Sequence, residues 1–237
     1  MSIAENIAEI NTRILEAEKR AGRKPGSVTL ICVTKTRTVE EITEAVKAGA
    51  FELGENRVQE LMDKYDRMQD VAVVTEMKYN IKWNLIGQLQ RNKVKYVIGK
   101  TYLIHSVDSY RLAEEIEKRA EDADVDVDVL IQVNPAGEKQ KGGVSLPEAE
   151  SLTCEIESGL PRVHVKGLMS VVPIVESPEE VRSYFREVKQ VFDKMASGRP
   201  EFKHLSMGMT HDYEVAIEEG ATMVRIGTGI FGSRAQI

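Results

Sequence analysis

The segment Val28-Thr-Leu-Ile-Cys-Val33-Thr-Lys35-Thr-Arg-Thr38 passes from apolar and β-branched residues to a lysine and then to polar residues. The apolar run is typical of a buried strand and is too short for a helix. Burying a charged lysine at the end of such a strand is costly unless it is paired or modified, although its methylene chain also lets it reach solvent. The segment therefore predicts a strand over residues 28–33, and it leaves the role of Lys35 open.

The same change from strand to helix recurs along the chain. Further strand-like runs are expected at residues 50–53, 83–86, 102–105, 127–133, 163–167, 204–205 and 223–226. Helix starts are predicted at the capping-box pairs Ser2/Glu5, Thr38/Glu41, Ser145/Glu148 and Ser177/Glu180, and also at Ser106-Val-Asp108, Asp212 and Gly229. Isoleucines at positions 3, 7, 10 and 14 predict one more helix before the first strand.

The alternation of strands and helices predicts a parallel sheet of the α/β class. Eight strands favour a single-domain (β/α)8 TIM-type barrel over residues 1–237, with an extra N-terminal helix. An open sheet of the Rossmann type is the alternative, but no Gly-x-Gly-x-x-Gly motif follows the first strand.

Composition and charge argue against several classes of protein. The chain has 42% hydrophobic and 30% charged residues, as in a globular domain, and its net charge of −6 argues against a dedicated nucleic-acid-binding protein. The N-terminus is too polar for a signal peptide, and no apolar run is long enough to cross a membrane. We expect a cytoplasmic protein in which Cys32 and Cys154 are reduced. The 4 histidines lack the spacing of metal ligands, so no metal site is expected.

Glycine-rich segments follow the last two predicted strands, namely Leu205-Ser-Met-Gly-Met209 and Arg225-Ile-Gly-Thr-Gly229. In (β/α)8 barrels these two loops often bind phosphate, because glycines let backbone N–H groups approach an anion and a helix N-terminus adds partial positive charge. Lys35 and Asn56 follow the first and second strands, so they are expected at the same end of the barrel. A lysine near a phosphate site fits two chemistries: a Schiff-base aldolase acting on a phosphorylated sugar, and a protein that binds pyridoxal 5'-phosphate (PLP).

Several segments together resemble one family, the pyridoxal phosphate homeostasis proteins, which are similar to the N-terminal barrel of alanine racemases. The matching segments span almost the whole chain: Val33-Thr-Lys-Thr36, Gly54-Glu-Asn-Arg-Val-Gln-Glu60, Ile86-Gly-Gln-Leu-Gln-Arg-Asn-Lys93, His105-Ser-Val-Asp-Ser109, Gly167-Leu-Met169, Leu205-Ser-Met-Gly-Met209 and Val224-Arg-Ile-Gly-Thr-Gly-Ile-Phe-Gly232. One position departs from the family, which usually has Trp-His where this chain has Trp83-Asn84. Any role that depends on the charge of that histidine is therefore not expected here.

The resemblance implies a cofactor site for PLP. Lys35 would form the internal aldimine, and Arg225 would face the pyridine nitrogen and keep it unprotonated. The remaining positions implied are Ser206, Gly227 and Thr228 at the phosphate, Asn56 near the ring, and Met169 near the bound cofactor.

The resemblance further implies a role in intracellular PLP homeostasis, in which the protein holds the cofactor for regulation or for delivery to PLP-dependent client enzymes. Alanine racemase-like enzymes need a second domain that supplies a base, and this chain ends just after the eighth predicted strand. We therefore expect no committed catalytic activity and no catalytic residues. Separately, we expect a monomer. The alternatives are a low-activity PLP-dependent amino-acid racemase and a cofactor-free Schiff-base aldolase.

Overall fold

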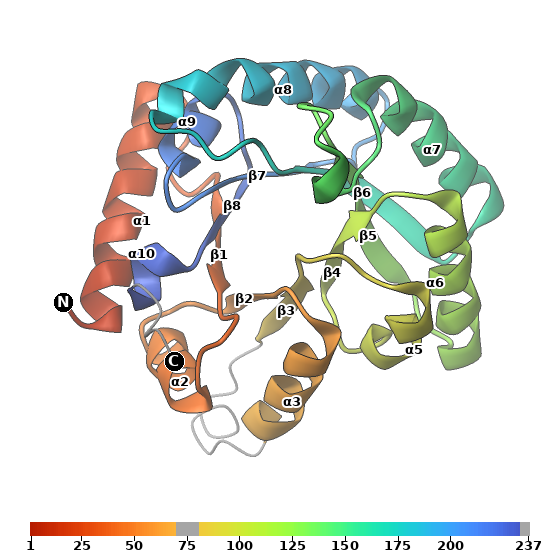
Figure 1. Ribbon diagram of the computed structural model, residues 1–237, viewed down its shortest axis with the longest axis horizontal. Helices are drawn as coiled ribbons and strands as arrows, with labels where there is room; N and C mark the ends of the chain where they lie inside the picture. The colour runs from red at the N-terminus through yellow and green to blue at the C-terminus, as the bar shows by residue number, and fades with distance from the viewer. Residues whose placement is uncertain (70–80, 233–237) are drawn as a thin grey trace.

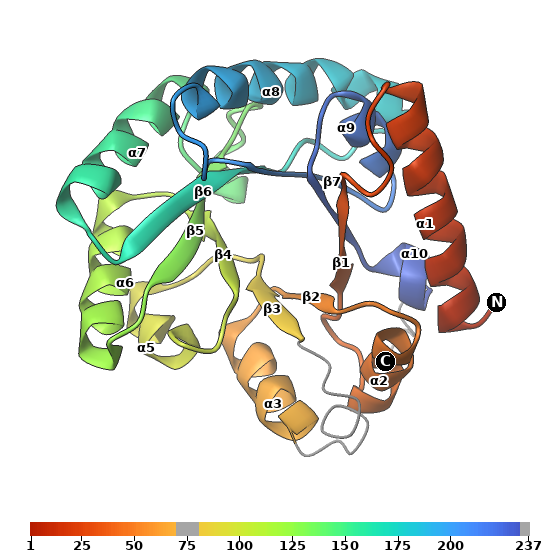
Figure 2. The ribbon, with the colours of Figure 1, turned by 180° about the vertical axis from the view of Figure 1, so that it is seen from behind.

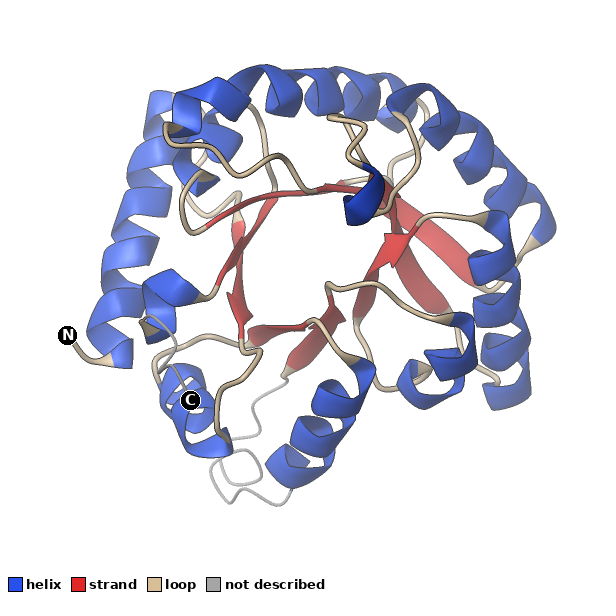
Figure 3. Cartoon of the chain, in the orientation of Figure 1, coloured by secondary structure: helices blue, strands red, loops and turns tan. Residues whose placement is uncertain are grey.

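Eight parallel strands form a closed barrel in the computed structural model, which describes residues 1–69 and 81–232 (Figures 1 and 3). The strands follow the order of the chain, and the first pairs with both the second and the last, which closes the sheet. The predicted (β/α)8 barrel is confirmed, and the open sheet is wrong. The strands are β1 Thr29–Val33, β2 Glu52–Glu55, β3 Lys82–Leu85, β4 Leu103–Val107, β5 Val127–Val133, β6 Val163–Ser170, β7 His204–Met209 and β8 Met223–Ile226.

The helices surround the barrel (Figure 3). They are α1 Ile3–Arg20, α2 Val39–Lys47, α3 Val58–Gln69, α5 Val94–Val97, α6 Tyr110–Ala123, α7 Leu146–Gly159, α8 Arg182–Ala196, α9 Tyr213–Glu218 and α10 Thr228–Phe231, with 3-10 turns η1 Arg91–Lys93, η2 Lys139–Lys141 and η3 Pro178–Val181. The extra helix α1 lies beside α9 and α10, as opposite views show (Figures 1 and 2). It buries Ile7, Ile10 and Ile14, as its isoleucine spacing predicts.

Local signals place most element boundaries correctly. Capping boxes form at Ser2/Glu5, Thr38/Glu41, Ser145/Glu148 and Ser177/Glu180, because each needs only residues three apart. The start predicted at Ser106-Val-Asp108 is wrong. β4 continues to Val107, which pairs with Ile131 beyond a register shift, so α6 begins after Ser109. β2 lies two residues later than predicted and β6 extends to Ser170, because pairing with neighbouring strands sets their ends.

The core has two layers. A large cluster fills the space between strands and helices, and a small cluster of Ile31, Leu103, Leu130, Met169 and Met223 lies inside the barrel. Alternation along β1 sends Cys32 to the outer layer and Ile31 to the barrel interior. Because side chains two residues apart share a face, the same alternation directs Val33 and then Lys35 toward the cavity that they both line.

Candidate functional site

A cavity of about 420 Å³ opens at the carboxyl ends of the strands. Its volume lies in the range of roughly 300–1,000 Å³ that is typical of small-molecule sites. Its position is the one at which (β/α)8 barrels carry their functional sites. The lining residues come from the ends of strands and from the loops after them: Val33, Lys35, Thr36, Arg37, Asn56, Ile86, Val171, Ile174, Met209, Thr210, His211, Arg225, Gly227 and Thr228.

The structure brings most of the predicted cofactor residues to this cavity. Lys35, Asn56, Arg225, Gly227 and Thr228 all line it, although they come from three separate parts of the chain. The other predicted site residues lie deeper. Met169 belongs to the small cluster inside the barrel, and the fully buried Ser206 is bonded to neighbouring side chains.

The loop after β8 has the geometry of an anion cradle. Gly227 packs so closely on β1 that an added Cβ would lie 3.2 Å from the carbonyl oxygen of Val33. Thr228 then begins α10 at the cavity, whereas the N–H groups of Ile230 and Phe231 are already bonded to the carbonyl oxygen of Gly227. From the facing loop, Thr210 also lines the cavity, and its hydroxyl accepts the N–H of Gly229 at 3.5 Å.

Asn56 has a buried polar atom that a bound molecule could satisfy. Its Oδ1 is buried and has no hydrogen-bond partner among the described residues, although such atoms are nearly always bonded in folded proteins. Asn56 lines the same cavity as Lys35, so a molecule bound there with a suitable donor would satisfy this oxygen. The orphaned oxygen, the lysine and the buried arginine together fit a ligand with a carbonyl group and several polar atoms, as PLP has.

Gly87, two residues beyond the end of β3, sets the position of Asn56. An added Cβ would lie 2.2 Å from the carbonyl oxygen of Asn56, which no real contact tolerates. Gly87→Ala should therefore displace Asn56, weaken PLP binding and lower the free energy of unfolding by about 1–3 kcal/mol. Fluorescence titration with PLP and urea unfolding measure the two effects. The control is Gly159→Ala, whose added Cβ would lie 2.6 Å from the hydroxyl oxygen of Tyr110. That contact is with the end of a side chain outside the cavity lining, so this variant should lose less stability and keep its PLP affinity. Unchanged PLP affinity in Gly87→Ala would contradict this role of Asn56.

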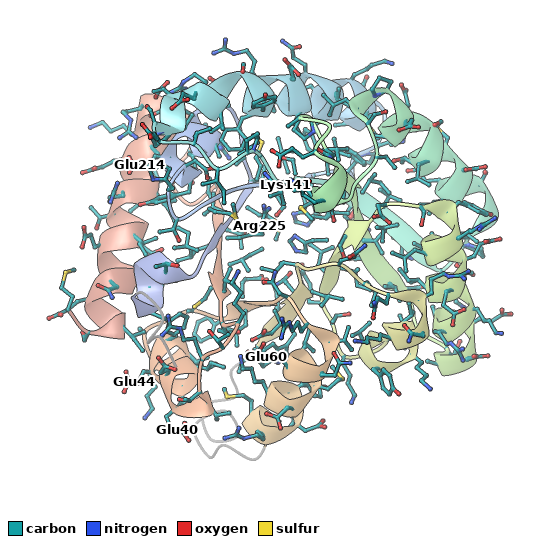
Figure 4. All side chains as sticks on the ribbon, viewed as in Figure 1. Glu40, Glu44, Glu60, Lys141, Glu214 and Arg225 are labelled. Carbon is teal, nitrogen blue, oxygen red and sulfur yellow. The ribbon has the colours of Figure 1, made fainter. Side chains whose placement is uncertain are left out.

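A chain of buried polar side chains crosses the barrel below the cavity. Arg225, inside the barrel in Figure 4, donates to the Ser206 hydroxyl at 2.6 Å and to the carbonyl oxygen of Ser170 at 2.8 Å. The Ser206 hydroxyl and the Nδ1 of His105 are 3.1 Å apart, and the Nε2 of His105 is 3.3 Å from the Oδ1 of Asn84. Burial lowers the pKa of Arg225 to about 10, so the guanidinium stays protonated at neutral pH.

Asn84, at the position where the family usually has histidine, sets the direction of this chain. Its amide nitrogen donates to Glu52 at 3.0 Å and to the carbonyl oxygen of Leu53 at 3.2 Å, so its oxygen must accept from His105. The proton of His105 therefore sits on Nε2, and Nδ1 accepts from Ser206. The arrangement needs a neutral histidine at position 105, and Asn84 takes part in it without a group that titrates near neutral pH.

His105 gives stability a defined pH dependence. Burial lowers its pKa well below the usual range, and the charge of Arg225 lowers it further. The unfolded chain therefore binds a proton below about pH 6.5 that the folded protein does not bind, and the free energy of unfolding should fall by up to about 1.4 kcal/mol per pH unit below that value. Urea unfolding at several pH values tests this, with His105→Asn as the variant whose decline should be shallower. Equal slopes in both proteins would contradict it.

The sequence also raises thiol, metal-ligating and membrane-spanning groups as features outside the cavity. Cys32 and Cys154 are free thiols, and burial raises the pKa of Cys32 to about 12, which makes it a poor nucleophile. Within residues 1–69 and 81–232, no group of three or more His, Cys, Asp or Glu side chains is arranged to hold a metal ion. In the same ranges no helix has both the length and the apolar character needed to span a bilayer.

Sequence reasoning missed several lining residues. Thr210 and His211 directly follow β7, which contains the glycine-rich segment 205–209, and their place beyond a strand end was the available signal. It also missed Glu55, Glu60 and Lys64, which lie beside the Lys35 loop. Here the signal was the i, i+4 spacing of Glu60 and Lys64 on α3.

Comparison with known proteins agrees with this geometry. The family model of the alanine racemase N-terminal domain matches residues 5–235. The pyridoxal phosphate homeostasis protein of Aquifex aeolicus is 46% identical, with 99% of each chain aligned, and that of Escherichia coli is 38% identical, over 98% of this chain and 97% of the relative. The structure of PipY from Synechococcus elongatus with PLP bound superposes with a TM-score of 0.80 at 30% identity, covering 98% of this chain and 100% of PipY.

Proposed function

The chain belongs to the alanine racemase N-terminal domain family and, within it, to the pyridoxal phosphate homeostasis proteins, and from this we propose that it binds PLP in the cavity beside Lys35. In this proposal residues 1–237 form one cofactor-binding domain, and Lys35 is linked covalently to the cofactor aldehyde. One observation carries the proposal: Lys35, Asn56 with its orphaned oxygen, Arg225, Gly227 and Thr228 converge on one cavity.

Each lining residue has a chemical task in this proposal. Lys35 supplies the amine that reacts with the aldehyde. Gly227 and Thr228 would hold the phosphate with the first turn of α10, together with Thr210 from the facing loop. Arg225 keeps its charge and is fixed by Ser170 and Ser206, so it would present N–H donors to the pyridine nitrogen and prevent its protonation.

Ser206 and Met169 would act indirectly in this proposal. The Ser206 hydroxyl accepts from Arg225 and donates to His105, so it would hold Arg225 in place. Its contact with the phosphate remains a prediction. Met169 packs beneath the cavity and would support the floor on which the cofactor lies.

We propose that the protein holds PLP for regulation or delivery and has no committed catalytic activity. The named relatives are homeostasis proteins, and among the described lining residues no carboxylate or tyrosine is present that could act as a base opposite Lys35. His211 also lines the cavity. Its Nε2 lies 3.1 Å from the carbonyl oxygen of Glu176, so this ring nitrogen is already engaged in a hydrogen bond. The client enzymes, the monomeric state and the cytoplasmic location remain predictions.

Titration of the purified protein with PLP tests the proposal. We expect a visible absorption band that saturates at one equivalent of PLP and disappears on borohydride reduction, which fixes the cofactor on Lys35. No band and no binding would sink the proposal and would leave the aldolase alternative. Rapid loss of α-deuterium from labelled amino acids by the loaded protein would instead favour the racemase alternative.

A further inference from the structure

The loop that carries Lys35 has a strained backbone. The carbonyl oxygen of Thr34 accepts the N–H of Arg37 at 3.0 Å, so residues 34–37 form a β-turn with Lys35 and Thr36 at its centre. Thr36 has a φ of 65°, which is the type II geometry that normally requires glycine or asparagine at this position. A β-branched residue there is strained, and such strain persists only where surrounding contacts hold it.

Three ionisable side chains, Glu55, Glu60 and Lys64, lie beneath this turn and are called the Lys64 cluster here. The Lys64 ammonium is almost fully buried and donates to Glu55 at 2.6 Å and to Glu60 at 2.7 Å. Glu55 is completely buried in the last position of β2. Glu60 and Lys64 lie one turn apart on α3, and Figure 4 shows Glu60 on the barrel side of that helix.

The Lys64 cluster is hydrogen-bonded to the residues on both sides of Lys35. Before it, the Thr34 carbonyl oxygen accepts from the Lys64 ammonium at 2.6 Å, and the Thr34 hydroxyl donates to Glu55 at 2.6 Å. After it, the N–H of Thr36 donates to the carboxylate of Glu60. Both flanking residues of the cofactor lysine are therefore tied to one buried group of charges.

The bond from Thr36 to Glu60 selects the turn type. If the peptide between Lys35 and Thr36 flipped, the turn would become type I and Thr36 would relax to negative φ. The flip would also turn the Thr36 N–H away from Glu60. Burial acts to raise the pKa of Glu60, but hydrogen bonds from Lys64 and from Thr36 outweigh burial and lower that pKa. Glu60 thus remains an ionised acceptor, which forms the stronger kind of hydrogen bond.

We propose that the Lys64 cluster positions Lys35, by bonding both of its neighbours and so holding the strained turn that carries the lysine at the cavity. Glu55, Glu60 and Lys64 are positioning residues in this account, since they contact the turn and none of them lines the cavity. The inference rests on the proposed PLP function, because presentation of Lys35 matters for a reaction at its amine. It goes beyond that function by explaining why a threonine occupies a glycine position beside the reactive lysine.

A rescue experiment separates the effect of the turn geometry on PLP loading from the effect of lost stability. Glu60→Ala removes the acceptor, and the rate at which the visible band appears after mixing with PLP should fall by about tenfold to a hundredfold, as expected for a misplaced reacting group. Thr36→Gly alone removes a side chain that lines the cavity, so its own loading rate is the reference for the rescue. In the double variant glycine adopts positive φ without strain, so the rate should return to within a few-fold of that of Thr36→Gly.

Glu148→Ala is the matched control. Like Glu60, Glu148 lies in the first turn of a helix and its carboxylate accepts a backbone N–H, but it is on α7 and not beside the Lys35 turn. It should lose stability and load PLP normally. The proposal is overturned if Glu60→Ala unfolds more easily but loads at the wild-type rate, or if Thr36→Gly fails to rescue it.

A measurement without cofactor keeps this inference separate from the proposed function. If wild-type protein forms no band with PLP, the proposed function fails. The locked turn is then judged by the amide proton NMR signal of Thr36, which should lie far downfield in wild type and in Glu148→Ala and shift upfield in Glu60→Ala. An unshifted Thr36 signal in Glu60→Ala contradicts the locked turn whatever the cofactor does.

Discussion

Replacing Lys35 with alanine should abolish the visible absorption band that forms when wild-type protein is mixed with one equivalent of PLP. Lys35 follows β1 into the cavity at the position from which its amine can reach a bound aldehyde. Alanine keeps the strand and the turn but has no amine, so only noncovalent contacts from Asn56, Arg225 and Thr228 would remain. We expect the band to fall to background and bound PLP to wash out on gel filtration.

Lys203→Ala is the control for Lys35→Ala. Lys203 is exposed and precedes β7, at the opposite end of the barrel from the cavity. This variant should keep the full band. If Lys35→Ala formed the same band at the same rate as wild type, the cofactor would be linked elsewhere and the assignment of Lys35 would be wrong.

Lys64→Met should lower the free energy of unfolding by about 3–5 kcal/mol, because removing one partner of a buried ion pair leaves an uncompensated charge. Glu55 is that charge, since its carboxylate is fully buried and its Oε2 already has no hydrogen-bond partner among the described residues. Methionine matches the length of the lysine, so packing changes little. Urea unfolding followed by circular dichroism measures the loss.

A double variant identifies the cause of this loss. Adding Glu55→Gln to Lys64→Met removes the uncompensated charge, so the double variant should be more stable than Lys64→Met alone. If the two losses simply add, the pairing of Lys64 with Glu55 is not the source of the effect.

The loss in Lys64→Met should also depend on pH. Burial raises the pKa of Glu55, and bonds from Lys64 and Thr34 oppose that rise in the wild type. Without Lys64 the pKa rises further. A carboxyl group with a raised folded pKa costs stability above that pKa, and the cost disappears as pH falls toward the unfolded value of about 4.3. Relative to wild type, the deficit of Lys64→Met should therefore be smaller at about pH 5 than at neutral pH.

A cavity residue was predictable from the sequence when it directly follows a strand. Lys35 and Asn56 follow β1 and β2, and Gly227 and Thr228 follow β8, so counting strands is enough to bring them together. The Lys64 cluster was not predictable in this way. Its bonds join Thr34 to residues on the next strand and helix, and only the packing of α3 on the barrel makes Lys64 a buried lysine.

The sequence alone determined the order of strands and helices and most helix starts, because hydrophobic period and capping act between residues a few positions apart. The tertiary structure decided which face each polar side chain takes. Along β7 the pairing with β8 shifts register between Ser206 and Met209, where Gly208 has a φ of 91°. The shift leaves Ser206 buried against Arg225 and brings Met209 to the cavity. A bulge of this kind depends on pairing with a distant strand, so no pattern within the segment could predict it.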